Sequence, residues 1–227
     1  MAVQLNNLYN SNASTWKLKV EVQLKLLKST KQTKPPSLFR VYAASASTNA
    51  RQLIESGDIK AITPREAATA TGSEGYVLLD VRPVWEREKA RVSGSLHVPL
   101  FVEDEDISPI TLIKKWVHFG YIGLWTGQSF TTLNPDFLNQ VVEVVPDKDT
   151  KLLVACGEGL RSLMAAWKLY NDGGYRKLGW LAGGFNRSSE GDFEGVEGPE
   201  KLEYATIGGV SYYFLQLLLL LRAVGKD

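Results

Sequence analysis

The sequence predicts a three-layer α/β domain, in which a central parallel sheet has helices on both faces, followed by an apolar C-terminal helix. Two short continuous apolar runs, residues 77–79 and 152–155, are typical of strands that are buried on both faces. Segments with apolar residues at helical spacing lie between and after these runs, and this alternation indicates parallel pairing. A chain of 227 residues has room for one such domain with extensions at both ends.

A helix is predicted after Asn134, which can serve as its N-terminal cap, with Pro135 in the first turn. Apolar residues then recur at helical spacing up to Val145, and Pro146 ends the pattern. Residues 175–181 are predicted to form a turn and a last strand. Because parallel sheets bind ligands beyond the carboxyl ends of their strands, the residues that follow the predicted strands are candidates for a functional site.

The only cysteine, Cys156, lies where a predicted strand, a glycine-rich loop and a predicted helix meet. Gly157 and Gly159 allow such a loop to curl its amides around an anion, and the positive end of the helix dipole points the same way. Both effects favour the thiolate, and Arg161 adds a fixed positive charge. The alternative is an inert cysteine in the core, which is common, but an arginine beside a buried inert thiol would be costly. The pattern therefore favours a reactive cysteine.

Composition and charge exclude several classes of function. The chain has 26 basic and 25 acidic residues, a formal net charge of +1, and no basic stripe, so we expect no nucleic-acid partner. One cysteine and two histidines, His97 and His118, cannot form a metal-ligand cluster, and we expect no metal and no cofactor. A lone cysteine also has no resolving partner in the chain, so any oxidised or persulfidated Cys156 must be discharged by an outside molecule.

The six residues from Cys156 to Arg161 resemble the active-site loop of the rhodanese-like sulfurtransferases. Four other stretches resemble parts of that family in the same order, and together they cover about residues 60–190: residues 61–67, 76–82 with the Asp-Val-Arg signature, 92–99 and 180–185. Two departures are visible. Ala90-Arg91-Val92 stands where the family often has Gly-His-Ile, and the segment 102–133 is longer than a compact domain of this family needs.

The resemblance implies a rhodanese-like fold over residues 60–200 with an aromatic insert at 102–133. It implies a sulfurtransferase in which Cys156 carries sulfane sulfur as a persulfide from a donor, a small molecule or a protein, to a thiophilic acceptor. Related cysteine-dependent phosphatases of this fold have a loop one residue longer, so the shorter loop favours sulfur transfer. The substrate would be bound by Arg161 together with the rest of the loop, namely Gly157, Glu158, Gly159, Leu160 and Ser162.

Asp80 follows a predicted buried strand on the side of the cysteine, and we expect it to hold Arg82 or nearby backbone through charge-assisted hydrogen bonds rather than to act in the chemistry. A second function class stays open: a rhodanese-like binding or scaffold module without turnover, at a plastid membrane. Retention of both Cys156 and Arg161 favours the enzyme. Glu158 argues against an anionic donor such as thiosulfate, because like charges repel.

Residues 1–43 are predicted to be a disordered transit peptide, followed by a linker or first helix at 44–59. Glu21 is the only acidic residue up to Ile54, whereas lysine, serine and threonine are frequent and no long apolar core is present. The small residues after Arg40 suit a processing site. This composition favours a chloroplast protein, stromal or thylakoid-associated, over a mitochondrial one.

The C-terminal part, residues 201–227, is predicted to contain an apolar helix over residues 210–224. Residues 204–221 carry no charge, and Leu217–Leu221 are five consecutive leucines. A helix this apolar must be covered, either by the aromatic insert around residues 116–130 or by a membrane that it contacts through residues 205–221. The run is short for a spanning helix, but the leucines favour membrane association.

Overall fold

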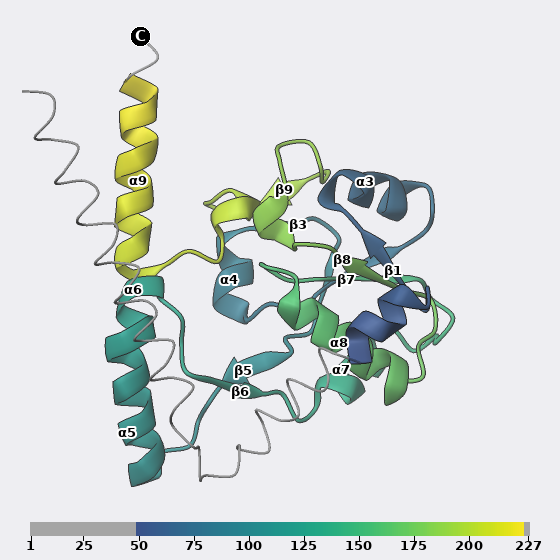
Figure 1. The fold of residues 1–227 in the computed structure, drawn as a ribbon, viewed down its shortest axis with the longest axis horizontal. Coiled ribbons are helices and arrows are strands. Elements are labelled where there is room, and N and C mark those ends of the chain that lie inside the picture. The colour runs from purple at the N-terminus through teal and green to yellow at the C-terminus, as the bar shows by residue number, and fades with distance from the viewer. Residues whose placement is uncertain (1–48, 225–227) are drawn as a thin grey trace, which may run out of the picture. The chain divides into compact units, whose positions relative to one another are not determined.

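The structure is a computed structural model that describes residues 49–224. The predicted transit peptide and most of the segment 44–59 therefore lie outside the described residues, although residues 49–55 are helical. The domain is built on a five-stranded parallel sheet with the strand order β1-β8-β7-β2-β4 (Figure 1). These strands are β1 (Ile59–Ile62), β8 (Leu178–Leu181), β7 (Leu152–Ala155), β2 (Val77–Asp80) and β4 (Leu96–His97). The predicted parallel sheet is confirmed.

The central strand β7 is buried on both faces, as its continuous apolar sequence predicts. Leu152 and Val154 belong to the core on one face, which is completed by the helices α7 (Phe137–Val144) and α8 (Leu160–Asn171). Leu153 and Ala155 belong to the core on the other face, which α3 (Pro64–Gly72) covers. Alternate residues of one strand thus hold two helical layers, which gives the three-layer architecture.

Several short elements complete the domain. Beyond the carboxyl ends of β2 and β8 lie α4 (Val84–Lys89) and a 3₁₀ turn, η2 (Phe185–Arg187). Two small antiparallel pairs are added, one between β3 (Arg91–Val92) and β9 (Val196–Glu197), the other between β5 (Phe101–Glu103) and β6 (Thr131–Leu133). The second pair closes the base of the aromatic insert.

The insert is mostly helical. It contains α5 (Pro109–His118), a π-helical turn η1 (Phe119–Gly123) and α6 (Leu124–Thr126), which follow one another without a break up to Gly127. Ser108 begins α5 because its hydroxyl accepts a hydrogen bond from the Thr111 amide. Hydrogen bonds from Thr111 and Ser108 hold the pKa of Asp106 at about 2, so its carboxylate supports the same turn.

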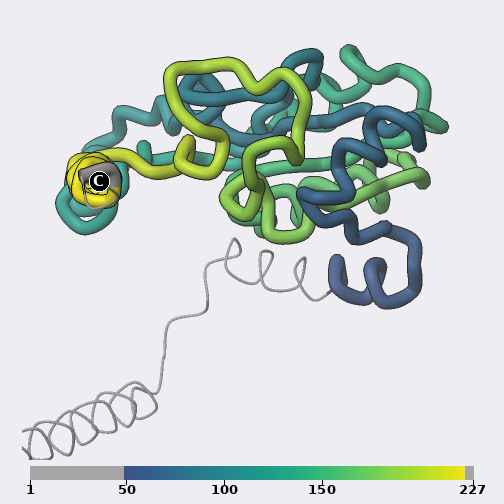
Figure 2. The backbone as a smooth tube through the Cα atoms, turned by 90° about the horizontal axis from the view of Figure 1, so that it is seen from above, coloured from purple at the N-terminus to yellow at the C-terminus, as the bar shows by residue number. Residues whose placement is uncertain are grey.

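The C-terminal helix α9 (Gly209–Val224) confirms the predicted helix, and it stacks end to end on α6 (Figure 1). Figure 2 views the stacked helices of the insert and α9 along their common axis, with α9 nearer to the viewer. The preceding residues are not part of the helix: η3 (Leu202–Tyr204) is a single 3₁₀ turn, and residues 205–208, which we call the strap, continue it as a turn and a short connection. In the described part of the chain, no helix is both long and apolar enough to cross a membrane.

The predicted cap of α7 is wrong. Asp136, not Asn134, precedes the first residue of α7. The Asn134 side chain is buried and accepts a hydrogen bond from the Asp136 amide while donating to the Pro99 carbonyl. The residue therefore ties the helix entry to the chain before β5 instead of capping the helix.

His97 ends β4, and its Nε2 lies 2.8 Å from the Arg82 carbonyl oxygen. Burial lowers the pKa of this half-buried imidazole, although the Arg82 carbonyl and Asp80 oppose the change. Between the lowered pKa and the ordinary value of about 6.5 the unfolded chain binds more protons than the folded protein. The contribution of His97 to stability is thus present above about pH 6.5 and is lost as the pH falls through the folded pKa.

We predict that His97→Gln reduces the dependence of the unfolding free energy on pH in this range. Urea denaturation at about pH 7.5 and about pH 5.5 should show a larger loss of unfolding free energy for the wild type than for the variant. Equal losses in the two proteins would contradict the assignment.

Candidate active site

The cysteine lies at the carboxyl end of the central strand, enclosed by the first residues of the following loop and helix. Its sulfur accepts hydrogen bonds from the backbone amides of Gly159, at 3.1 Å, and Ser162, at 3.2 Å. The Cys156 thiol also lies 3.3 Å from the Ser162 hydroxyl oxygen, which in turn donates to the Gly159 carbonyl. The loop thus places donors around the sulfur as the glycine-rich sequence predicts, at the N-terminus of α8.

Arg161 forms a two-pronged ion pair with Glu86 of α4, with nitrogen–oxygen distances of 2.8 and 2.6 Å. Glu86 is only 1% exposed, so the pair lies at the edge of the core. Burial alone would lower the pKa of Arg161, but the Glu86 carboxylate and Cys156 together hold that pKa above its ordinary value. The guanidinium is therefore fixed as a cation whose charge is already balanced by a carboxylate.

The sequence analysis did not identify Glu86. It lies in the run Trp85-Glu86-Arg87-Glu88-Lys89, whose alternating charges are typical of an exposed helix. Its partner is far along the chain, and only the fold brings them together. The one local signal is its position directly after the Asp80–Arg82 signature.

Asp80 and Arg82 form a second, fully buried ion pair. The Arg82 guanidinium donates to both carboxylate oxygens at 2.7 to 3.1 Å, and the Arg82 amide donates to the same carboxylate at 3.0 Å. Arg82 also donates to the Ala90 carbonyl and stacks over the Phe185 ring at 4.5 Å. Arg87 reaches the Asp80 carboxylate from α4 at 3.3 Å. The expected pairing of Asp80 with Arg82 is therefore present, and Arg87 extends it to the helix that carries Glu86.

The turn after β8 holds the cysteine loop in place through backbone hydrogen bonds. The Phe185 amide donates to the Cys156 carbonyl at 2.8 Å, and the Asn186 amide donates to the Gly157 carbonyl at 2.9 Å. Gly184 has φ +67°, and a Cβ there would lie 2.3 Å from the Gly157 oxygen. Only glycine fits this approach. The Trp180 indole adds a hydrogen bond of 2.7 Å to the Gly159 carbonyl.

The strap covers the loop from the other side. The Thr206 methyl group lies where a Cβ on Gly157 would have to go, 2.2 Å from that position. The Thr206 hydroxyl donates to the Asn186 side chain at 3.0 Å. Cys156 is fully buried, whereas the Glu158 and Leu160 side chains of the same loop are exposed. The sequence offers no signal that Thr206 lies beside the cysteine loop, because this residue belongs to the apolar C-terminal part, residues 201–227.

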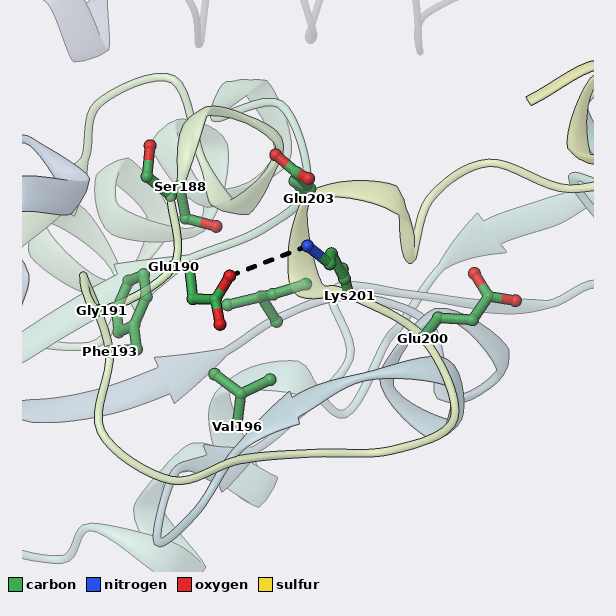
Figure 3. A pocket seen from close by; sticks show the side chains of 10 residues that line it. Ser188, Glu190, Gly191, Phe193, Val196, Glu200, Lys201 and Glu203 are labelled. Atoms are coloured by element: carbon green, nitrogen blue, oxygen red, sulfur yellow. Dashed lines mark ion pairs between the residues drawn. The ribbon is translucent and has the colours of Figure 1, made fainter. Parts of the chain in front are cut away.

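A separate pocket of about 290 Å³ lies between the chain after η2 and the chain before η3 (Figure 3). Phe193, Val196 and Leu202 form its apolar part, and Lys201 faces Glu190 across it at 3.8 Å. Cys156 is not among its lining residues. Within residues 49–224, no group of three or more histidine, cysteine or acidic side chains is arranged to hold a metal ion.

Comparison with known proteins gives a consistent result. The family model for the rhodanese-like domain matches residues 63–190. Rhodanese-like domain-containing protein 10 of Arabidopsis thaliana is 63% identical over 188 residues, which cover 83% of this chain and 87% of that protein. Rhodanese-like domain-containing protein 11, named chloroplastic, from the same plant is 43% identical and covers 71% of this chain and 54% of that protein.

A third relative, rhodanese-like domain-containing protein 9 of A. thaliana, also named chloroplastic, is 36% identical over 70% of this chain and 67% of that protein. The matched region contains four of the five strands of the sheet, all but β1, together with the cysteine loop and both ion pairs described above. This chain belongs to the rhodanese-like domain family.

Proposed function

We propose that the protein is a sulfurtransferase that carries sulfane sulfur as a persulfide on Cys156. The observation that carries the proposal is the pair of backbone amides, from Gly159 and Ser162, that point at the sulfur. Donors in this arrangement stabilise negative charge on the thiolate. The family includes sulfurtransferases, and this chain keeps both the cysteine and the loop arginine.

The reaction has two displacement steps. The Cys156 thiolate attacks the outer sulfur of a donor; a new sulfur–sulfur bond forms, and the old one breaks with its electron pair leaving on the remainder of the donor. A thiolate acceptor then attacks the outer sulfur of the persulfide, and Cys156 leaves as a thiolate. No external oxidant or reductant is needed. Ser162 suits both states, because its hydroxyl accepts from the thiol and can rotate to donate to a thiolate.

Arg161 is proposed to bind the donor and to stabilise the charge on the sulfur. Because Glu86 already balances its charge, the site has less surplus positive charge than a free arginine would give it. This arrangement, with Glu158 exposed on the same loop, favours a persulfide donor of low charge over the doubly negative thiosulfate. We further propose that the protein acts in the chloroplast, on the strength of the two relatives named chloroplastic.

A binding or scaffold module is the second candidate, and one observation favours it. Cys156 is fully buried, so a donor reaches its sulfur only if the loop or a neighbouring group moves. The first prediction below separates the two candidates.

Cys156→Ser should abolish sulfur transfer, because an alcohol cannot hold a sulfane sulfur under these conditions. Incubation with thiosulfate or with glutathione persulfide, followed by intact-mass measurement, should show a gain of one sulfur atom on the wild type only. Added thiol should then restore the original mass. Transfer by the serine variant, or no sulfur gain by the wild type with any donor, would overturn the enzyme proposal.

Arg161→Met should destabilise the protein by about 3–5 kcal/mol, because Glu86 would remain as a buried carboxylate without its partner. A second substitution, Glu86→Leu, should recover much of this loss in urea denaturation. Transfer activity should stay low in the stable double variant, because the site no longer has the arginine that binds the donor. Full activity in that variant would remove Arg161 from the mechanism.

Asp80→Asn should also destabilise the protein by about 3–5 kcal/mol, since it leaves the buried Arg82 guanidinium without a counter-charge. Persulfide formation per folded molecule should fall only in part, because Asp80 acts through the position of α4, Glu86 and Arg161 and not on the sulfur itself. A variant with wild-type stability but no transfer would show that Asp80 acts in the chemistry.

A further inference from the structure

The largest apolar surface of the described chain lies on the helical column, which we define as residues 109–126 together with α9. The two parts meet end to end at three glycines, Gly127, Gly208 and Gly209, where a Cβ on Gly127 or Gly209 would lie within 2.7 Å of the other segment's backbone. Gly127 and Gly209 both have positive φ, so side chains would strain as well as crowd this junction. The column stands along one side of the domain in both views (Figures 1 and 2).

Large apolar side chains project from this column into solvent. Trp116 is 78% exposed, Tyr121 81% and Tyr213 73%. Other apolar residues of the column are also more than a third exposed: Ile110, Leu112, Ile113, Val117, Phe119, Ile122, Leu124, Trp125, Phe214, Leu217, Leu218, Leu220 and Leu221. A soluble surface rarely gathers so many neighbouring apolar groups, so the column is built to be covered.

The charges of the column indicate which kind of partner surface binds to it. Residues 107–135 and 204–226 contain no aspartate or glutamate, while Lys114, Lys115 and Arg222 lie on the column and Lys226 follows it. The acidic run 103–106 precedes the column at the end away from α9, and Asp104 pairs there with Lys115. A second copy of the column would bring Lys114 and Arg222 towards further positive charges, whereas anionic lipid headgroups would supply a counter-charge.

The aromatic composition and the length agree with an interface. Tryptophan and tyrosine favour the boundary between headgroups and hydrocarbon, because each ring has an apolar body and a polar atom. The 16 residues of α9 extend about 24 Å, less than the roughly 30 Å of a hydrocarbon core. This length, with the aromatic side chains, favours a position in the interface over one across the bilayer.

We propose that the helical column is a membrane anchor that lies in the surface of an anionic bilayer, with both the insert and α9 in contact with lipid. This extends the membrane contact expected for residues 205–221 to the insert, and it does not depend on the activity of Cys156.

The strap gives the anchored domain a fixed orientation. The Gln128 side chain donates to the Thr206 carbonyl at 3.1 Å, and the Lys89 ammonium donates to the Ile207 carbonyl at 2.5 Å. The strap therefore joins the column both to α4 and, through Thr206, to the cysteine loop. A membrane that binds the column also holds the site at a set distance from its surface.

The test is flotation of the full chain with vesicles of phosphatidylcholine alone or mixed with phosphatidylglycerol. The protein should float with the mixed vesicles, float less with the neutral ones, and lose binding as salt is added. Trp116→Glu and Leu218→Glu should each weaken binding about tenfold or more, because an apolar side chain in lipid is replaced by a charge. Lys114→Glu should weaken binding to the mixed vesicles only.

Val144→Glu is the matched control, since Val144 is an exposed apolar residue of α7, outside the column. It should float like the wild type, and circular dichroism should show that all variants keep their helices. A wild type that stays unbound with both vesicle types would overturn the proposal. A wild-type dimer in light scattering that Trp116→Glu converts to a monomer would overturn it as well, because the column would then be an interface between copies.

Discussion

The architecture of the site depends on one buried carboxylate at the end of β2. Asp80 is the last residue of β2, and it pairs with Arg82 just after the strand and with Arg87 on α4. These ion pairs fix the short helix against the sheet. That helix presents Glu86, and Glu86 in turn holds Arg161 beside the cysteine loop. A helix of six residues has little stability of its own. Its position, and with it the direction of the arginine, comes from this chain of charge pairs.

The sequence was sufficient to predict the parts of the structure that depend on local pattern. The apolar run 152–155 gave the central strand, and Gly157 and Gly159 gave the loop that turns its amides to the sulfur. Pairing between Asp80 and Arg82 was also predictable, because the two residues are nearly adjacent. The resemblance to the family supplied the segments 61–67, 92–99 and 180–185, which contain or overlap β1, β4 and β8.

What the sequence did not reveal depends on contacts between distant residues. Glu86 looked like one charge in an exposed helix, and its burial follows from packing that no local pattern encodes. Thr206 could not be linked to the loop before the course of the strap was known. Asn134 is a suitable cap by residue type, but α7 begins at Phe137, so its side-chain oxygen holds the Asp136 amide in the turn before the helix while its nitrogen donates to the distant Pro99 carbonyl.

The two apolar segments, the insert and α9, are packed at their ends but exposed along their sides. Their ends pack closely through glycine backbones, which makes the column continuous, while their sides remain uncovered by the domain. Neither segment was predicted to extend the other, because stacking of helices end to end leaves no periodic signal in the sequence.

The route of the strap has a consequence for the way the protein matures. The chain is synthesised from its N-terminus, so the cysteine loop exists before Thr206 does, and Gly157 gains its contact with Thr206 only after residue 206 has been made. Until then Gly157 lacks the neighbour that packs on it, and the loop that turns its amides to the sulfur has fewer contacts than in the finished fold. Synthesis of the strap is thus the step that completes the packing of the loop, and a molecule shortened before residue 206 would keep a cysteine loop without this contact.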